Sequence, residues 1–282
     1  MKDRRFFVVT PVLNGAKYMA QTLASIDAQT FPGWTHYVVD GGSSDGTVEL
    51  VQASMKDEPR RHLIQGRDRG LYDAVFKGFE AIEADGLRDD DICLWLNADD
   101  LLAPWAFATM LLAFEQYQAD WVTAQRGQWD AEGRLVLLRP FGWYPRWCLR
   151  KGWFNERCLG PIQQESTFFT ARLLRRLPQE AIAAIRALRI VGDFFLWRQF
   201  AQFAPLHAAP TLIGGFRLHG ANLSMGSVER NMAELRAIGA FLPPAGLGRA
   251  LRFLYLVLAT LMAGVKARHA LSPPDETGLT VR

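Results

Sequence analysis

The sequence predicts an α/β fold in which helices flank a mostly parallel sheet. Over the first 125 of 282 residues, short apolar runs of strand length alternate with segments of helical periodicity. This alternation is typical of parallel strands joined by crossover helices. The polar motifs of this stretch follow the apolar runs, at the sheet edge where such folds bind ligands. The apolar fraction of 49% is sufficient for a packed core and excludes disorder as the main state.

The individual elements follow from local patterns. The apolar run at 6–9 predicts a buried strand, which we expect to end at Thr10 and Pro11. A second strand over 34–39 ends at Asp40 and the glycines that follow it. The remaining expected elements are helices over 16–28, 47–55 and 71–84 and a strand over 92–96.

Charge and hydropathy divide the chain into three regions, which span residues 1–125, 126–245 and 246–282. The middle region is basic, because eleven Lys and Arg stand against four acidic residues between 139 and 198. The last region contains one long apolar segment, 250–265, which predicts a C-terminal apolar helix. We expect the polar tail after it, 272–282, to be frayed.

Composition narrows the class of protein. The net charge of +3 is too small to indicate nucleic-acid binding, and we expect no nucleic-acid partner. Cys93, Cys148 and Cys158 lack the CxxC spacing of zinc sites and are unlike a disulfide framework. The N-terminal stretch has no signal-peptide core, so we expect a cytoplasmic protein.

The first polar motif, DGGSSDGT at 40–47, follows the second strand. Asp40 can accept hydrogen bonds from a base or ribose, and the glycines permit close approach of a ligand to the backbone. Asp45 and Thr47 can also serve as ordinary turn and cap residues. A dinucleotide-binding loop is disfavoured because the chain has no GxGxxG after its first strand.

The second motif places two adjacent carboxylates, Asp99 and Asp100, after the strand at 92–96. Such a pair is unfavourable unless positive charge lies nearby. A divalent cation completed by a diphosphate would supply that charge, which favours Asp99 as a metal ligand. Asp100 can equally cap the helix expected after Pro104.

Four segments together resemble the family 2 nucleotide-sugar glycosyltransferases of the GT-A fold. They are VTPVLN at 9–14, VDGGSSDGT at 39–47, DRGLYDAVFKG at 68–78 and LNADD at 96–100. The resemblance implies a Rossmann-like sheet. It also implies that residues 1–125 bind the nucleotide sugar, and that residues 126–245 bind the acceptor and supply the catalytic base.

The resemblance also implies individual roles. The NAD tripeptide at 97–99 occupies the position of the family's DxD motif, with Asp99 as the ligand of Mn²⁺ or Mg²⁺. Asn97 replaces the first Asp of the motif and can still bond a ribose or sugar hydroxyl. The residues implied to bind the nucleotide sugar are Thr10, Pro11, Asn14, Asp40, Asp68, Asp73, Asn97 and Asp99.

Four downstream residues complete the implied site. The segment 160–169 resembles the one that flanks donor sugar and acceptor, which places Gln164 and Glu165 on the acceptor side. Inverting transfer needs a carboxylate that takes the acceptor proton. Asp193, a lone acid among apolar residues that favour a raised pKa, fits this role, although it can also cap the following helix, and Glu165 is a second candidate. His219 corresponds to a metal ligand or diphosphate contact, or else to an ordinary loop residue.

Two segments concern partners. Aromatic residues interleave with basic ones at 141–154, a pattern that suits sugar stacking, phosphate binding, a membrane interface or simply a core. The apolar segment 250–265 is shorter than the roughly 20 residues of a membrane span. It suits either peripheral contact with the inner face of a membrane through 250–268 or docking on protein. The basic residues that would anchor a membrane contact are Arg249, Arg252, Lys266 and Arg268.

These observations predict an inverting, metal-dependent glycosyltransferase. It would move a sugar from a nucleotide diphosphate donor to a glycan or lipid-linked glycan acceptor, in surface polysaccharide or lipopolysaccharide assembly. One alternative is a sugar nucleotidyltransferase. Such an enzyme is expected to have a Gly-rich loop with a nearby Arg and Lys after its first strand, and the sequence TPVLNG at 10–15 disfavours it. The other is a non-catalytic carbohydrate-binding protein on the same fold.

Overall fold

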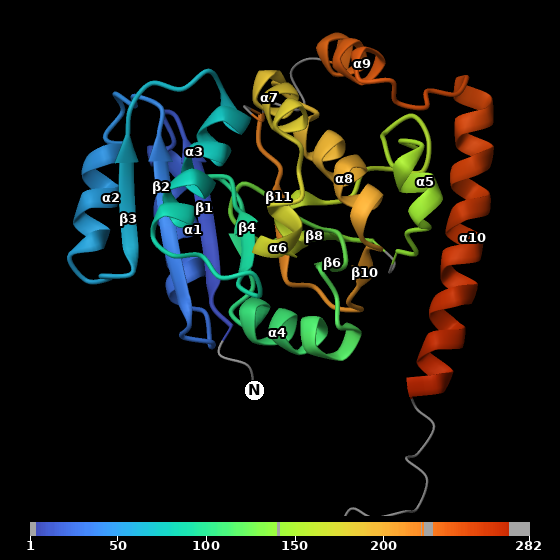
Figure 1. Ribbon diagram of the computed structural model, residues 1–282, viewed down its shortest axis with the longest axis horizontal. Helices are drawn as coiled ribbons and strands as arrows, with labels where there is room; N and C mark the ends of the chain where they lie inside the picture. Colours follow the sequence, from blue (N-terminus) through green and yellow to red (C-terminus); the bar gives the residue numbers. More distant parts are fainter. Residues whose placement is uncertain (1–3, 140–141, 221, 223–227, 271–282) are drawn as a thin grey trace, which may run out of the picture.

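A seven-stranded sheet forms the centre of the protein (Figure 1). The computed structural model describes residues 4–139, 142–220, 222 and 228–270, with side chains up to 261 in the last helix. The strand order is β10-β6-β9-β4-β1-β2-β3, and only β9 runs antiparallel to its neighbours. This arrangement confirms the predicted, mostly parallel sheet. The strands are β1 (Phe6–Val12), β2 (Trp34–Asp40), β3 (Arg61–Gln65), β4 (Ile92–Trp95), β6 (Trp121–Thr123), β9 (Thr167–Thr170) and β10 (His207–Ala208).

Two of the first four strands differ from the sequence expectation. β1 stays paired with β2 and so continues through Thr10 and Pro11 to Val12, whereas its pairing with β4 ends at Val9. Pro11 points to the same side as Val9, so its missing N–H falls where no strand is paired. β3 was not predicted, since this edge strand carries only two adjacent apolar residues.

Helices cover both faces of this sheet and enclose separate apolar cores. One face packs on α3 and α8 through alternate residues of β1 and β2, and this core includes the three cysteines, which are buried free thiols. The opposite face packs on α1, α2 and α4. The helices are α1 (Ala16–Asp27), α2 (Thr47–Met55), α3 (Leu71–Ala84), α4 (Ala106–Tyr117), α5 (Arg146–Arg150), α6 (Ala171–Leu174), α7 (Gln179–Ala187), α8 (Gly192–Phe203), α9 (Val228–Ala237) and α10 (Ala245–Ala270).

A second, four-stranded sheet has the order β5-β11-β7-β8. β9 inserts between β4 and β6 in the large sheet, so residues beyond 126 complete the sheet that the first 125 residues begin. The two sheets therefore share one structural unit. The strands of the small sheet are β5 (Leu101–Leu102), β7 (Gly127–Trp129), β8 (Leu135–Leu138) and β11 (Gly214–Arg217).

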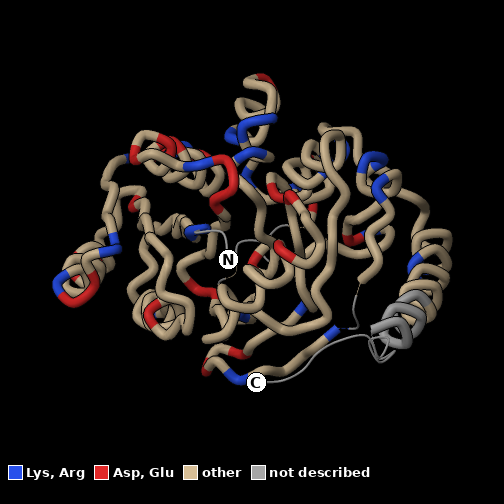
Figure 2. The backbone as a smooth tube through the Cα atoms, turned by 60° about the horizontal axis from the view of Figure 1, so that its bottom comes forward, with Lys and Arg blue, Asp and Glu red and all other residues tan. Residues whose placement is uncertain are grey.

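The predicted C-terminal apolar helix is α10, which stands beside α5 at the edge of the molecule (Figure 1). In Figure 2 it is a mostly tan helix, because it carries few charged residues. Among the described residues, no helix has the length and apolarity to cross a membrane. The tail 272–282, Phe141, and the side chains of Lys266 and Arg268 lie outside the described residues.

Candidate active site

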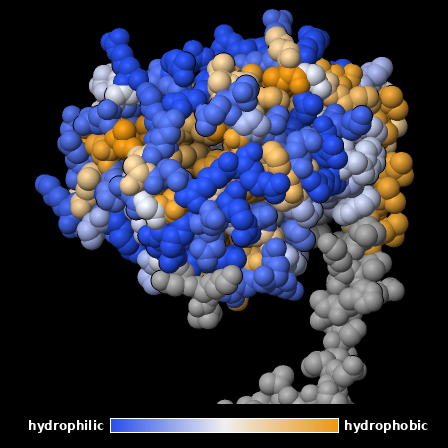
Figure 3. All heavy atoms as spheres, in the orientation of Figure 1, coloured by the Kyte–Doolittle hydropathy of each residue, from blue (hydrophilic) through white to orange (hydrophobic). Residues whose placement is uncertain are grey.

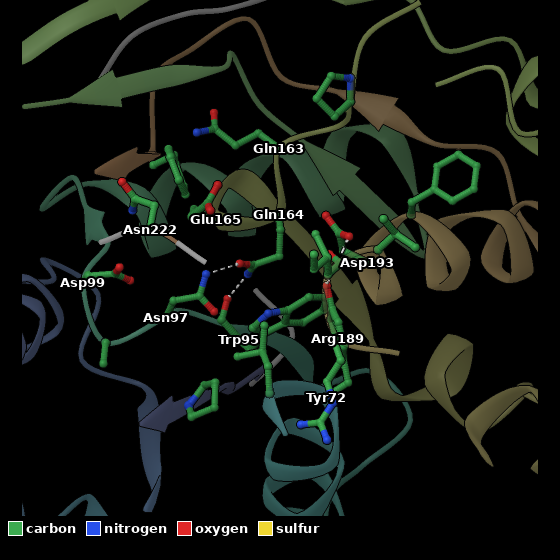
Figure 4. Close-up of a pocket in the computed structure, with 18 of the residues that line it drawn as sticks. Tyr72, Trp95, Asn97, Asp99, Gln163, Gln164, Glu165, Arg189, Asp193 and Asn222 are labelled. Atoms are coloured by element: carbon green, nitrogen blue, oxygen red, sulfur yellow. Dashed lines mark hydrogen bonds between the residues drawn. The ribbon is translucent and has the colours of Figure 1, made fainter. Parts of the chain in front are cut away.

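A cavity of about 1320 Å³ lies along the carboxyl edge of the large sheet. Residues 11–15 at the end of β1 and 97–99 after β4 line it. Because β9 runs antiparallel to β4, residues 163–165 before β9 reach the same edge. The small sheet contributes residues next to β7 and β11. Figure 4 shows Asp99 on one side of this cavity and Asp193 on the other.

Asn14 connects the ends of β1 and β2. It has a left-handed backbone, with φ 55°, and its side-chain oxygen accepts a hydrogen bond from the Ser44 N–H at 2.9 Å. The Asn14 N–H in turn donates to the hydroxyl of Ser43 at 2.8 Å. Asp45 accepts from the N–H groups of Ala16 and Thr47, so it holds the turn and the start of α1. These bonds fix the loops that flank the cavity.

Asp68 lines the cavity at the start of α3 and lies against the end of β2. Its Oδ1 accepts the Gly70 N–H at 2.8 Å. A Cβ added at Gly41 would lie 2.4 Å from Asp68 Oδ2, so a side chain at position 41 would displace this carboxylate. Glycine at position 41 therefore permits the close approach of Asp68.

Three residues expected in the nucleotide pocket do not line the cavity. Thr10 is buried and its hydroxyl contacts Nε2 of His36 at 2.9 Å. Asp40 is buried and its Oδ2 accepts the Gly42 N–H at 2.9 Å and the Ser43 N–H at 3.0 Å. Both side chains are engaged behind the cavity wall, because their strands turn them toward the protein interior.

Asp73 is the third of these residues. Its carboxylate lies 2.8 Å from Arg186 and 3.1 Å from Arg69, with Lys77 at 3.6 Å. Burial alone would raise the pKa of Asp73, but the hydrogen bonds from Arg186 and Arg69 hold it well below its usual range. Asp73 thus ties α3 to α7 rather than facing the cavity.

Asp99 and His219 form the polar side of the cavity. Asp99 Oδ2 lies 2.8 Å from His219 Nε2, and both residues line the cavity. Asn222 supports the histidine by accepting its backbone N–H at 2.7 Å. Buried Arg217 donates to the Asp99 carbonyl at 2.6 Å, which places a positive charge beside the two adjacent carboxylates.

Asp100 is buried and turned away from the solvent. It accepts the Arg217 N–H at 2.8 Å and the Asn97 amide at 3.0 Å, so it does not cap α4, which begins after Trp105. Burial, followed by the charges of Glu165 and Asp99, raises its pKa well above the usual range. Asn97 also donates to Gln164 Oε1 at 3.2 Å, which joins the segments after β4 and before β9.

Glu165 is buried beside Asp100, and the two carboxyl groups interact electrostatically. Burial raises the pKa of Glu165 to about 7. Two close carboxyl groups in an apolar setting favour a shared proton. Glu165 and Asp100 therefore form a partly protonated pair at the back of the cavity.

Asp193 is the second residue of α8, so it is not the N-cap, a position that Val191 occupies. Burial raises its pKa to about 6. Tyr72 lies beside it, with its hydroxyl 3.3 Å from Asp193 Oδ1. Asp193 lines the cavity and is partly accessible from it. A carboxylate with these properties is suited to accept a proton near neutral pH.

Several residues in or beside the site are not predicted by the sequence patterns. Tyr72 lies inside the recognised segment 68–78, but nothing in the sequence indicates its contact with Asp193. Arg217 precedes His219 by two residues and only tertiary contacts reveal its role. Arg126 and Gln128 flank the start of β7 and belong to no motif.

Asp99 and His219 are suitable ligands for a divalent ion. A carboxylate and an imidazole meet here, a donor set that Mn²⁺ accepts. Among the described residues no group of three or more acidic, His or Cys side chains converges, so a bound ion would need oxygens from a ligand. A nucleotide diphosphate is the kind of ligand that supplies them.

Comparison with known sequences identifies a family model. Residues 7–176 match the model described as Glycosyl transferase family 2. The TagX protein of Staphylococcus aureus is 25% identical over 151 residues, 48% of this chain and 41% of TagX. A PGL/p-HBAD biosynthesis glycosyltransferase of Mycobacterium bovis is 33% identical over 98 residues, 34% of this chain and 36% of that protein. The matches thus span about two fifths of these relatives' own lengths.

Comparison with solved structures addresses the fold. Staphylococcus aureus TarS 1-349, solved with UDP-GlcNAc, superposes with a TM-score of 0.62 at 15% identity, over 88% of this chain and 70% of that one. The mannosyltransferase PcManGT of Pyrobaculum calidifontis, solved with GDP-Man and Mn²⁺, gives 0.53 at 18% identity, over 98% and 76%. These likenesses confirm the predicted GT-A fold.

Proposed function

The chain belongs to glycosyl transferase family 2, and we propose that it is an inverting glycosyltransferase with a nucleotide diphosphate sugar as donor. The main support for this proposal is the arrangement of one cavity: the pair Asp99 and His219 lines one side of it, and Asp193 lines another side (Figure 4). Inverting displacement needs a site for the leaving diphosphate and a base on the opposite side of the reacting carbon. This cavity offers both.

The donor occupies the side formed by the ends of β1 and β4. Pro11, Asn14 and Asp68 contact the nucleoside, and Asn97 lies next to the ribose or sugar. Thr10, Asp40 and Asp73 act indirectly, because they hold the strands and loops that carry these residues. Structures of TarS with UDP-GlcNAc and of PcManGT with GDP-Man support a nucleotide-sugar ligand.

Asp99 and His219 hold the divalent ion, Mn²⁺ or Mg²⁺. When bound, the ion supplies positive charge that stabilises the negative charge developing on the leaving diphosphate. PcManGT, solved with Mn²⁺, supports the assignment. Asn97 replaces the first carboxylate of a DxD motif, so Asp99 is the one carboxylate of that tripeptide.

Asp193 acts as the general base. Its ionised carboxylate accepts the proton of the acceptor hydroxyl as the hydroxyl oxygen bonds to the anomeric carbon. The bond between that carbon and the diphosphate oxygen breaks at the same time, and the nucleoside diphosphate leaves with the electron pair. Because burial raises the pKa of Asp193 to about 6, the carboxylate is both ionised and basic near pH 7.

The acceptor is a glycan or a lipid-linked glycan, and the product belongs to surface polysaccharide or glycolipid assembly. The mycobacterial relative is named for a role in PGL/p-HBAD biosynthesis, which supports this class. The acceptor enters past Gln164 and Glu165, whose segment lines the cavity and is called here the acceptor wall.

We further propose that α10 contacts a membrane surface. Gly248, Arg252 and Tyr255 face the protein: Arg252 donates to the Cys158 carbonyl at 2.9 Å, and the Tyr255 ring lies 5.5 Å from that of Phe154. The other described sides of the helix are largely apolar and exposed, as the orange right edge of Figure 3 shows. A helix that is apolar nearly all round is normally covered.

Exposed residues of the neighbouring α5 support a lipid surface as the cover. Trp147 is 58% exposed, and it lies among the exposed basic residues Arg146, Arg150 and Lys151. Exposed Trp with Lys and Arg is typical of contact with anionic lipid headgroups. Phe154 lines the cavity on one side and contacts α10 on the other, so a lipid-linked acceptor would arrive at the acceptor wall.

A donor-binding screen tests the function. The melting temperature of the full chain is measured with UDP-, dTDP- and GDP-sugars, with and without Mn²⁺, because a ligand of the folded state raises it. A Mn²⁺-dependent rise with one nucleotide sugar is expected. Formation of nucleotide sugar and pyrophosphate from a nucleoside triphosphate and a sugar phosphate would instead establish a nucleotidyltransferase. No rise with any donor would contradict the proposal.

A further inference from the structure

Arg126 is a half-buried arginine that lines the cavity. Within the part of the chain that the structure describes, its guanidinium has no ion pair and no hydrogen bond. Burial lowers the pKa of Arg126 and the charge of Arg139 lowers it further, whereas the charges of Glu165 and Glu156 raise it. A partly desolvated cation beside a second cation is unfavourable unless an anion joins them.

The backbone around Arg126 is fixed. Its carbonyl accepts the Arg139 N–H at 2.8 Å, which sets the two arginines opposite each other where β7 and β8 begin to pair. The side chain of Gln163 clamps Gly127 from both sides, accepting its N–H at 2.8 Å and donating to its carbonyl at 2.6 Å. Gln128, two residues after Arg126, also lines the cavity. The guanidinium is therefore presented by a rigid strand end.

This position is separate from the Asp99–His219 side. Gly127 lies two residues before Trp129, which pairs with Arg217, and His219 follows Arg217 by two residues. Four residues of extended chain span about 13 Å, so the two backbone positions lie well apart along the small sheet. The acidic groups whose charges act most on Arg126 are Glu165 and Glu156, so the guanidinium lies toward the proposed acceptor side.

We propose that Arg126, assisted by Gln128, binds a phosphoryl group carried by the acceptor. The inference rests on the proposed transferase function and names the substrate class of its acceptor side. A guanidinium binds phosphate oxygens in bidentate fashion, and Gln128 adds an amide donor. Because Arg139 adds a second positive charge, a phosphoryl group fits better than a singly charged carboxylate. The acceptor is thus a phosphorylated or diphosphate-linked glycan.

A binding experiment tests the subsite without any donor. The affinity of the full, metal-free chain for phenyl phosphate is measured by calorimetry in EDTA, with benzoate as the carboxylate counterpart. Arg126→Ala is expected to weaken phenyl phosphate binding at least tenfold. Arg126→Lys is expected to weaken it less, because lysine keeps the positive charge but cannot form the two parallel hydrogen bonds of a guanidinium. Arg157→Ala is the matched control, since Arg157 is an exposed arginine near the same wall that does not line the cavity.

The outcomes separate this inference from the proposed function. Equal affinity in Arg126→Ala, Arg126→Lys and the unaltered protein would overturn it, as would benzoate binding as tightly as phenyl phosphate. An unchanged melting temperature of the unliganded variants shows that folding is intact. If a nucleotide sugar raises the melting temperature but the affinity for phenyl phosphate is the same with and without Arg126, only the proposed phosphate subsite is contradicted. If phosphate binding depends on Arg126 but no nucleotide sugar binds, only the transferase proposal fails.

Discussion

The hydroxyl of Tyr72 lies 3.3 Å from Asp193 Oδ1, across 121 positions of sequence. The single proton of this hydroxyl is shared between Asp193 and the Ile190 carbonyl, which lies 2.8 Å away. Gly192 makes this approach feasible, because an added Cβ would lie 2.6 Å from the Tyr72 ring. The first turn of α3 is thereby fixed to the start of α8. This contact links the segment that follows Asp68 to the proposed base.

Replacing Asp193 by Asn should abolish most of the transfer but preserve donor binding. The amide keeps the shape of the side chain and cannot take the acceptor proton, so the rate should fall about 10²–10⁴-fold. Transfer is measured as release of nucleoside diphosphate, and donor binding as the rise in melting temperature. Glu165→Gln is the comparison. A larger loss in Glu165→Gln than in Asp193→Asn would make Glu165 the base.

The rate of transfer should rise with pH and level off above about pH 6. The base works only when ionised, and burial raises the pKa of Asp193 to about 6, so activity is lost as pH falls through that value. The Tyr72 hydrogen bond favours the ionised form, whereas the charge of Glu156 disfavours it. Tyr72→Phe should therefore move the acidic limb to higher pH. An unmoved limb in Tyr72→Phe would show that the limb belongs to another group.

Removing either proposed metal ligand should abolish the contribution of the metal ion to donor binding and leave the metal-free affinity for the donor unchanged. Asp99→Ala and His219→Ala are expected to lose the extra rise in melting temperature that Mn²⁺ gives to the bound nucleotide sugar. His62→Ala, on the edge strand β3 and away from the cavity lining, is the histidine control. If EDTA leaves donor binding and transfer unchanged in the unaltered protein, metal dependence is wrong.

Gly41→Ala should destabilise the protein because of one contact. The new Cβ would lie 2.4 Å from Asp68 Oδ2, and overpacking of this kind costs about 1–3 kcal/mol in the free energy of unfolding. In the background of Asp68→Ala the same change should cost much less, since the carboxylate is gone. Denaturant titration of the two single variants and the double variant measures this coupling. Additive effects would show that Asp68 does not press on Gly41.

Phe253→Glu on α10 should reduce binding to vesicles that contain anionic lipid. Phe253 is 72% exposed, so the change should leave folding intact while placing a charge at the proposed lipid contact. Leu112→Glu on α4 is the matched control, because Leu112 is 62% exposed on a helix that packs on the opposite face of the sheet from α8. Flotation with vesicles measures the effect. Equal flotation of both variants would contradict the proposed lipid contact. If the protein is a dimer that Phe253→Glu dissociates, the exposed face of α10 is an interface between two copies of the chain.

Local patterns determined the order of elements in this protein. Buried strands such as β1 and β4 consist of short apolar runs in the sequence, because both of their faces pack on helices. The helix over Leu71–Ala84 coincides with its prediction, since its apolar residues follow one stripe. β3 was missed because an edge strand with partly exposed residues has no such run. The family, and with it the α/β fold, was likewise recognisable from segments in the first hundred residues.

The site residues were only partly predictable. Sequence patterns indicated Asp99 and Asp193, and the family resemblance indicated His219. Tertiary contacts determined that Asp73 is paired with Arg186 and that Asp99 meets His219 across 120 positions. They also determined that Arg126 faces a cavity without an ion pair among the described residues. Sequence patterns record which face a residue takes, whereas the partners of a charge are set by strands that come together only when the sheets close.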